Sequence, residues 1–225
     1  MAFSDMPTQI KAKLSRLPTL EVFARFAPGT IDPIVALRNK YAPKQIYPRD
    51  VGIRLISHVY KNEFSLRTLT SNLMSLATTT IVPFDAPIIK AFRNSTVKKK
   101  ALPPSVYYQI SGVPNFYIAS HLSELFHDLH TQLNREPIAT SYKLGITGLL
   151  ESHQESGRIV KELSALEHPP PIRFDAFVLV TRSNLVAPFE LEGNDIIFPF
   201  SGNQMVYDSY LEDLKKRYRK PYEIL

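Results

Sequence analysis

The sequence predicts an α+β fold, with a helical N-terminal body followed by a small antiparallel β-meander and a C-terminal helix. Three observations predict it. A leucine stripe at helical spacing lies in the first third, and apolar residues recur at every second position after three prolines at 169–171. An amphipathic segment closes the chain. We expect a mainly helical body over 1–168, with a basic proline-rich loop at 78–114. The β-meander and last helix then occupy 169–225, and the two parts pack as one compact unit.

The first third is expected to consist of short helices separated by prolines. Apolar residues at helical spacing predict helices around 10–17 and 18–26, and DPIVALRNKY places proline at the favoured first turn of another. Asp50 is expected to cap a helix that runs to about residue 62. After Ser65, the next helix carries the clearest apolar stripe, formed by Leu66, Leu69, Leu73 and Leu76.

The middle of the chain is less regular. Over 78–112 we expect loop with short extended pieces such as SVYYQI, in which alternation would bury Val106, Tyr108 and Ile110. A helix should follow to about residue 134. The segment 141–167 is predicted to be helical, with interruptions at glycines.

In the last quarter, apolar residues recur at every second position. IRFDAFVLVT predicts a strand with apolar residues on both faces, and LVAPFELE and IIFPF predict two more strands joined by tight turns. A closing helix is expected from Asn203 to about Arg219. Its inward face would be formed by Tyr207, Leu211, Leu214 and Tyr218.

Composition excludes several classes of protein. The chain has no cysteine, which excludes disulfide frameworks, zinc fingers, iron–sulfur clusters and thiol nucleophiles. No apolar run is long enough to span a bilayer, and the N-terminus lacks the apolar core of a secretory signal. Basic and apolar residues before residue 26 are also found in mitochondrial presequences, but Asp5 and Glu21 are atypical of them. The compartment stays open, with an intracellular site expected and the mitochondrial matrix as one alternative.

The decapeptide HLSELFHDLH, residues 121–130, has the histidine density of a metal site. Glu124 and His127 match the Glu-x-x-His spacing of di-iron carboxylate proteins. On a helical wheel, however, all the apolar residues fall on one side and this pair on the other, whereas such sites need inward ligands and a second motif. We therefore expect an amphipathic helix and predict neither a metal nor a cofactor.

The usual catalytic signatures are also missing. The sequence contains no phosphate-binding glycine loop, no H-E-x-x-H and no G-x-S-x-G. We expect a protein that is not an enzyme, and an enzyme with a dispersed site is the less favoured alternative.

Two basic segments remain as candidate nucleic-acid contacts within a net charge of +6. The first has no acidic residue between Asp85 and Glu124 and interleaves cations with aromatics, as single-stranded nucleic acid requires. The second is the basic C-terminus. The predicted binding residues are Lys90, Arg93, Lys98, Lys99, Lys100, Tyr107, Lys215, Lys216, Arg217, Arg219 and Lys220.

Each segment also has a plainer interpretation. The tyrosines of the first would form a half-buried strand while its lysines only keep a loop solvated. In the second, Glu212 with Lys216 and Asp213 with Arg217 would form i, i+4 pairs.

The resulting hypothesis is a non-enzymatic structural protein of a large nucleic-acid-containing assembly. A viral capsid, nucleocapsid or matrix protein and an organellar ribosomal component both fit. Its partners would be RNA or another polyanion and other subunits of the assembly. The alternative from another class is a protein–protein adaptor that binds no nucleic acid.

Overall fold

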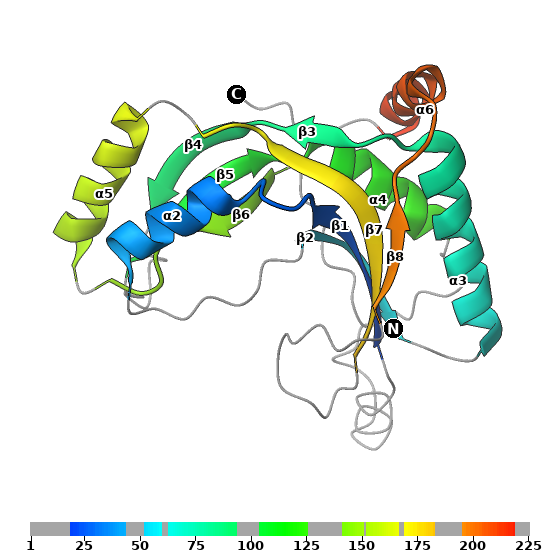
Figure 1. The fold of residues 1–225 in the computed structure, drawn as a ribbon, viewed down its shortest axis with the longest axis horizontal. Helices are drawn as coiled ribbons and strands as arrows, with labels where there is room; N and C mark the ends of the chain where they lie inside the picture. Colours follow the sequence, from blue (N-terminus) through cyan, green and yellow to red (C-terminus); the bar gives the residue numbers. More distant parts are fainter. Residues whose placement is uncertain are drawn as a thin grey trace.

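The computed structural model describes residues 19–43, 52–59, 63–93, 104–125, 141–150, 152–166, 169–182 and 195–218. Within these ranges, two antiparallel sheets, called sheet A and sheet B, form an arch with helices at both ends (Figure 1). The fold is a strand-rich α+β fold that begins with a strand and ends with a helix. The predicted helical N-terminal body is therefore wrong.

Sheet A has five strands in the described ranges, with the order β2-β1-β7-β3 and β8 also paired to β7. Its central strand β7, which pairs with β1, β3 and β8, comes from the last quarter of the chain. An ion pair between Arg25 and Asp175 (Nη2 to Oδ2, 2.7 Å) ties β1 to β7 across the sheet. The strands are β1 (Thr19–Phe26), β2 (Gly52–Val59), β3 (Phe84–Ala86), β7 (Ile172–Arg182) and β8 (Ile196–Pro199).

Sheet B, as far as the structure describes it, has three strands, β4 (Ile88–Arg93), β5 (Val106–Ser111) and β6 (Ser141–Gly145), with β5 in the middle. Only Pro87 separates β4 from β3, so the chain passes directly from one sheet into the other.

Five α-helices of the described part of the chain flank the sheets. In Figure 1, α2 and α5 lie at the end of the molecule that holds sheet B, and α3 and α6 lie at the other. A turn of π-helix (Leu76–Thr80) extends α3. The helices are α2 (Asp32–Tyr41), α3 (Glu63–Ser75), α4 (Val113–Leu125), α5 (His153–Ala165) and α6 (Gln204–Arg217).

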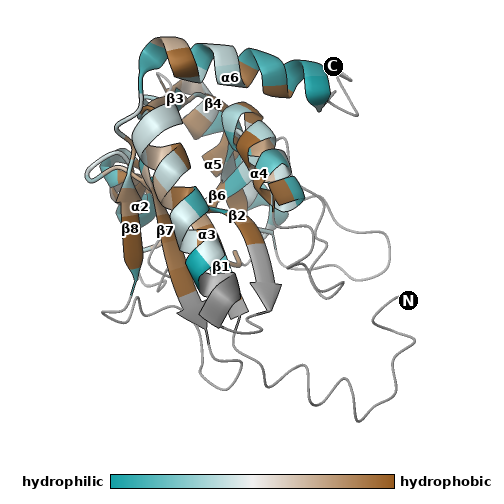
Figure 2. Ribbon diagram, turned by 90° about the vertical axis from the view of Figure 1, so that its right-hand side faces the viewer, coloured by the Kyte–Doolittle hydropathy of each residue, from teal (hydrophilic) through white to brown (hydrophobic). Residues whose placement is uncertain are grey.

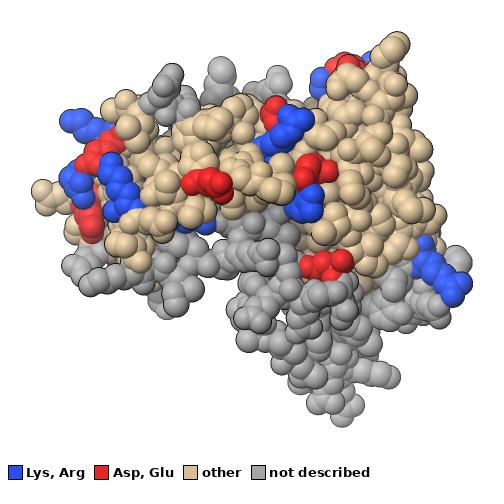
Figure 3. Space-filling view, viewed as in Figure 1, with Lys and Arg blue, Asp and Glu red and all other residues tan. Residues whose placement is uncertain are grey.

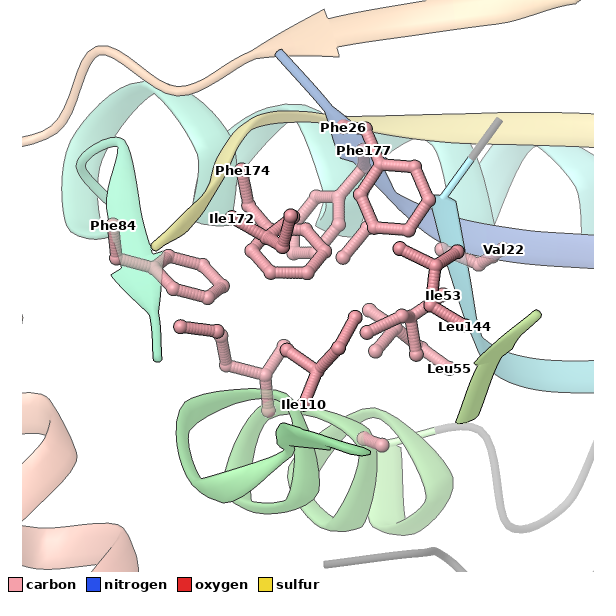
Figure 4. Close-up of a cluster of buried hydrophobic side chains, with 14 of the residues drawn as sticks. Val22, Phe26, Ile53, Leu55, Phe84, Ile110, Leu144, Ile172, Phe174 and Phe177 are labelled. Carbon is pink, nitrogen blue, oxygen red and sulfur yellow. The ribbon is translucent and has the colours of Figure 1, made fainter. Parts of the chain in front are cut away.

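One large apolar core joins the two sheets (Figure 4). Phe174 and Phe177 of β7, Ile53 of β2 and Ile110 and Leu144 of sheet B belong to it, and all are buried. In Figure 2 the brown, apolar colour follows the strands, whereas α6 alternates along its turns and is hydrophilic at its C-terminal end. β5 gives alternate residues to this core and leaves the others on the second face of sheet B. β4 departs from this alternation, because a register shift lies between Ile88 and Lys90 and its core residues are Ile88 and Ala91.

The helices expected around 18–26 and from Asp50 are strands β1 and β2. The residues of β1 that enter the large core, Leu20, Val22, Ala24 and Phe26, follow period two. In β2, a Cβ at position 52 would lie 1.9 Å from the carbonyl oxygen of Ala24, so only glycine allows β1 and β2 to approach so closely there. The helix expected at 10–17 lies outside the described residues.

Two other predictions need correction. The segment 141–167 begins with strand β6 rather than a helix, and only its second part is helical, as α5. The last three strands do not form a simple meander, because β7 has β1 on one side and β3 with β8 on the other. LVAPFELE lies outside the described residues.

The other strongly patterned elements agree with prediction. α2 spans the DPIVALRNKY segment, and α3 buries Leu69 and Leu73 completely. α6 begins after Asn203, whose side chain accepts hydrogen bonds from two backbone amides, and it buries Tyr207 and Leu214. Among the described helices, none has the length and apolar character needed to cross a membrane.

Candidate nucleic-acid interface

The second face of sheet B is the surface opposite the core, and it carries aromatic, cationic and amide side chains. Val106, Tyr108 and Ile110 of β5 are buried on the core side, as their alternation predicted. The residues between them point the other way. The face consists of Lys90 and Phe92 from β4, Tyr107 and Gln109 from β5, and Lys143 and Gly145 from β6.

Phe92 and Tyr107 form the aromatic part of this face. They are direct cross-strand partners, and their rings are stacked with centroids 5.6 Å apart and planes inclined by 26°. Tyr107 is also opposite Gly145, where a Cβ would stand 4.0 Å from the tyrosine ring, so the ring covers the glycine. The buried Ser105 hydroxyl lies 2.8 Å from the Tyr107 hydroxyl and donates to it. These contacts hold the ring in place.

Two lysines lie beside the rings. Lys143 and Lys90 are both exposed, and the Nζ of Lys143 lies 5.6 Å from the centroid of Phe92, within the range of a cation–π contact. In the register, Gln109 is opposite Lys90 on one side and Lys143 on the other, which gives a row of cation, amide and cation. The sequences of β4, β5 and β6 contain no carboxylate, so no acid on these strands neutralises the lysines.

Tyr142, next to Lys143, points toward the core, where burial raises its pKa to about 12. It therefore stays neutral in the physiological range and adds no negative charge beneath the face.

Arg93 does not join the second face. Its guanidinium donates from Nη1 to the backbone oxygen of His153 at 2.9 Å, at the beginning of α5. Because Arg93 follows Phe92 in the strand, it leaves on the opposite side, where it connects β4 to α5. It remains exposed and charged.

The basic end of α6 has a different environment, because its described cations are paired. Lys215 pairs with Glu212, and Lys216 with Asp213 at 3.7 Å. The pairs are thus i, i+3 rather than the predicted i, i+4. Arg217 pairs with Glu124 of α4, which also accepts a hydrogen bond from Tyr218.

These charges also appear mixed on the surface. In Figure 3, red and blue side chains are adjacent at the top right, where α6 lies, and again at the left end near α2 and α5. Figure 1 places α6 away from sheet B, so the described cations of the two predicted basic segments do not form one surface. Lys98, Lys99, Lys100, Arg219 and Lys220 lie outside the described residues.

The histidine-rich decapeptide begins in α4 and continues beyond the described residues. Leu122 is buried, and the His121 ring meets the Tyr210 ring edge-on at 5.6 Å. Burial, with a smaller contribution from Arg217, lowers the pKa of His121. The hydrogen bond from Tyr218 is the main reason why the pKa of Glu124 is also lowered. Within the described part of the chain, no three histidine or acidic side chains are grouped closely enough to hold a metal.

Of the residues on the second face, the sequence-based prediction names Lys90 and Tyr107 but not Lys143 or Gln109. Lys143 lies in a segment predicted to be helical, and it is outside the acid-free stretch between Asp85 and Glu124 on which the prediction rested. The available signal was the alternation in SYKLG, where Tyr142 and Leu144 enclose one lysine at strand spacing.

The comparisons with known proteins give distant structural similarities. No protein-family model and no curated protein sequence matches the chain. Among solved structures, TT0787 of Thermus thermophilus is similar with a TM-score of 0.48 at 16% identity, over 81% of this chain and 98% of that one. Kluyveromyces marxianus Usb1 with uridine monophosphate gives a TM-score of 0.40 at 9% identity, over 82% of this chain and 99% of that one.

Proposed function

We propose that this protein binds single-stranded RNA or another polyanion through the second face of sheet B, as a non-enzymatic component of a nucleic-acid-containing assembly. The observation that supports the proposal best is the stacked pair of Phe92 and Tyr107 beside the row of Lys90, Gln109 and Lys143, on strands without a carboxylate.

The chemistry of the face suits an unpaired strand. Flat aromatic rings offer a stacking surface to any exposed base, which contributes roughly 1–3 kcal/mol per base in known complexes. Ammonium groups beside the rings can contact the phosphates that flank a stacked base. A duplex keeps its bases stacked inside the helix, so it would use the lysines but not the rings.

The direct test is a salt titration of binding to a fluorescent single-stranded RNA. Wild-type protein should bind measurably at about 50 mM salt, and its affinity should fall linearly with salt on logarithmic axes. The double variant Lys90→Ala/Lys143→Ala should reduce that slope by about 1.4, since each phosphate contact on a single strand contributes about 0.7.

Lys40→Ala is the matched control. Lys40 also lies over an aromatic ring, that of Tyr41 at 4.8 Å, but it belongs to α2. This variant should keep the wild-type slope. The proposal is wrong if the wild-type protein binds no single-stranded RNA or DNA at low salt. It is also wrong if Lys40→Ala lowers the slope as much as the double variant Lys90→Ala/Lys143→Ala.

The role in an assembly requires a separate measurement. Protein isolated under native conditions should have the mass of a large particle and contain nucleic acid. A free monomer or small oligomer without nucleic acid would instead support the adaptor alternative.

A further inference from the structure

We infer that Gln109 is a specificity-determining residue, which reads the edge of a base stacked on Tyr107 and favours adenine. This inference rests on the proposed function, because it assigns a role to one more side chain of the same face.

The position of Gln109 suits this role. It lies two residues after Tyr107 in β5, and therefore on the same side of the sheet. Gln109 is half-buried, and it pairs with Lys90 on one side and with Lys143 on the other. If a base stacks on Tyr107 and its phosphates contact these lysines, one edge of the base faces the Gln109 amide.

A second residue anchors the amide. Gln109 donates from Nε2 to the hydroxyl oxygen of Ser141 on β6, at 3.0 Å. This contact limits the rotation of a side chain that is otherwise flexible, and a fixed side chain loses less conformational entropy when a ligand binds.

The remaining hydrogen-bonding capacity matches a base edge. A glutamine amide has two N–H donors and one carbonyl oxygen, and Ser141 uses one of the donors. One donor and one acceptor stay adjacent, an arrangement that pairs with the N7 and N6 groups of adenine. Lys90 and Lys143 carry only donors, which suit phosphates or the O6 and N7 acceptors of guanine, so a preference for adenine must come from another residue.

The experiment compares the affinities of oligo(A), oligo(C) and oligo(U) RNA of about 12 nucleotides, at one salt concentration. Wild-type protein should prefer oligo(A) by roughly 5- to 150-fold, the range expected for one bidentate base contact. Gln109→Met keeps the length of the side chain but removes its donors and acceptor, so this variant should bind the three strands almost equally. Its salt slope should match that of the wild type.

Ser141→Ala and Gln204→Met complete the set. Ser141→Ala removes the hydroxyl that accepts the Gln109 hydrogen bond, so it should reduce the preference for oligo(A) without abolishing it. Gln204 is an exposed glutamine on α6 that also donates to a side chain, Asp208 at 2.8 Å, and its replacement should leave the preference unchanged.

The failures are distinguishable. If wild-type protein binds none of the three strands, the proposed function and this inference both fail. If it binds all three equally, or if Gln109→Met keeps the wild-type ranking, the inference about Gln109 is wrong while binding by the second face stands.

Discussion

The second face of sheet B and the C-terminal end of α6 both carry cations beside tyrosines, in opposite electrostatic settings. On sheet B, Lys90 and Lys143 stand on strands without carboxylates. On α6, Lys215, Lys216 and Arg217 each lie against a carboxylate, two within the helix and one on α4. A count of charges in the sequence does not separate these regions. What separates them, among the described residues, is that the fold places a carboxylate against each of the three cations of α6, whereas the strands that carry Lys90 and Lys143 contain none.

The tyrosines show the same contrast. Tyr107 has its hydroxyl fixed by Ser105, and its ring covers Gly145 on the second face of sheet B. Tyr218 donates its hydroxyl to Glu124, and its half-buried ring packs with the small cluster between α4 and α6. One tyrosine lies on the face proposed to bind RNA, whereas the other closes a contact between two helices.

The largest expected effect is that of replacing Tyr107. Tyr107→Leu keeps an apolar side chain over Gly145 but removes the aromatic ring, so affinity for single-stranded RNA should fall roughly 5- to 150-fold. Tyr107→Phe keeps the ring and should stay within about twofold of wild type. Fluorescence anisotropy measures both, and circular dichroism confirms that the variants are folded. Equal losses in the two variants would show that the hydroxyl, not the ring, is the binding group.

A smaller effect concerns the acid stability of the contact between α4 and α6. Burial lowers the pKa of His121, with Arg217 adding to the effect and Glu124 opposing it. Because the unfolded chain then binds a proton more readily, His121 contributes stability above its ordinary pKa of about 6.5, and this stability is lost as the pH falls toward the lower folded pKa.

Between about pH 7.5 and pH 5.5, this linkage costs at most about 1.4 kcal/mol of unfolding free energy. Denaturant unfolding at the two pH values measures it, and His121→Gln should lose less stability on acidification than the wild type. The lowered pKa of Glu124 acts only below its ordinary range near 4.5, outside this window. An identical loss in both proteins would exclude His121 as the titrating group.

The smallest expected effect is that of the α6 lysines on RNA binding. Since Lys215 and Lys216 are paired with Glu212 and Asp213, Lys215→Ala/Lys216→Ala should change affinity by less than about twofold. The salt titration proposed for Lys90 and Lys143 applies directly. If Lys215→Ala/Lys216→Ala lowers the salt slope as much as Lys90→Ala/Lys143→Ala does, α6 is a main phosphate contact. The contrast drawn between α6 and sheet B is then wrong.

An element could be predicted from the sequence where its local hydrophobic pattern and its tertiary packing favoured the same secondary structure. α2, α3, β7 and α6 have strong periodicity that matches their final environment, and their positions were predicted. In β1, Val22, Phe23 and Phe26 fit a helix as well as a strand. The strand forms because β7, about 150 residues further along, supplies its partner, and no local rule contains that information.

The residues of the candidate site could likewise be predicted only where they lie close together in sequence. Lys90, Phe92 and Tyr107 lie in one acid-free segment, so composition alone identified the region. Lys143 and Gly145 reach it only through the pairing of β5 with β6, across a connection of about thirty residues. Arg93 shows the converse, because Phe92, the residue before it, belongs to the face while the fold directs the Arg93 side chain to α5.

The pairing of β1 with β7 also determines when the molecule can fold. During synthesis, Thr19–Phe26 leaves the ribosome about 150 residues before Ile172–Arg182, a delay of roughly 8 to 30 s at usual translation rates. Until then β1 lacks its central neighbour, and its apolar side chains are exposed to other nascent chains and to chaperones. A product truncated before β7 would lose its centre as well as its end, so we expect such fragments to be insoluble and rapidly degraded.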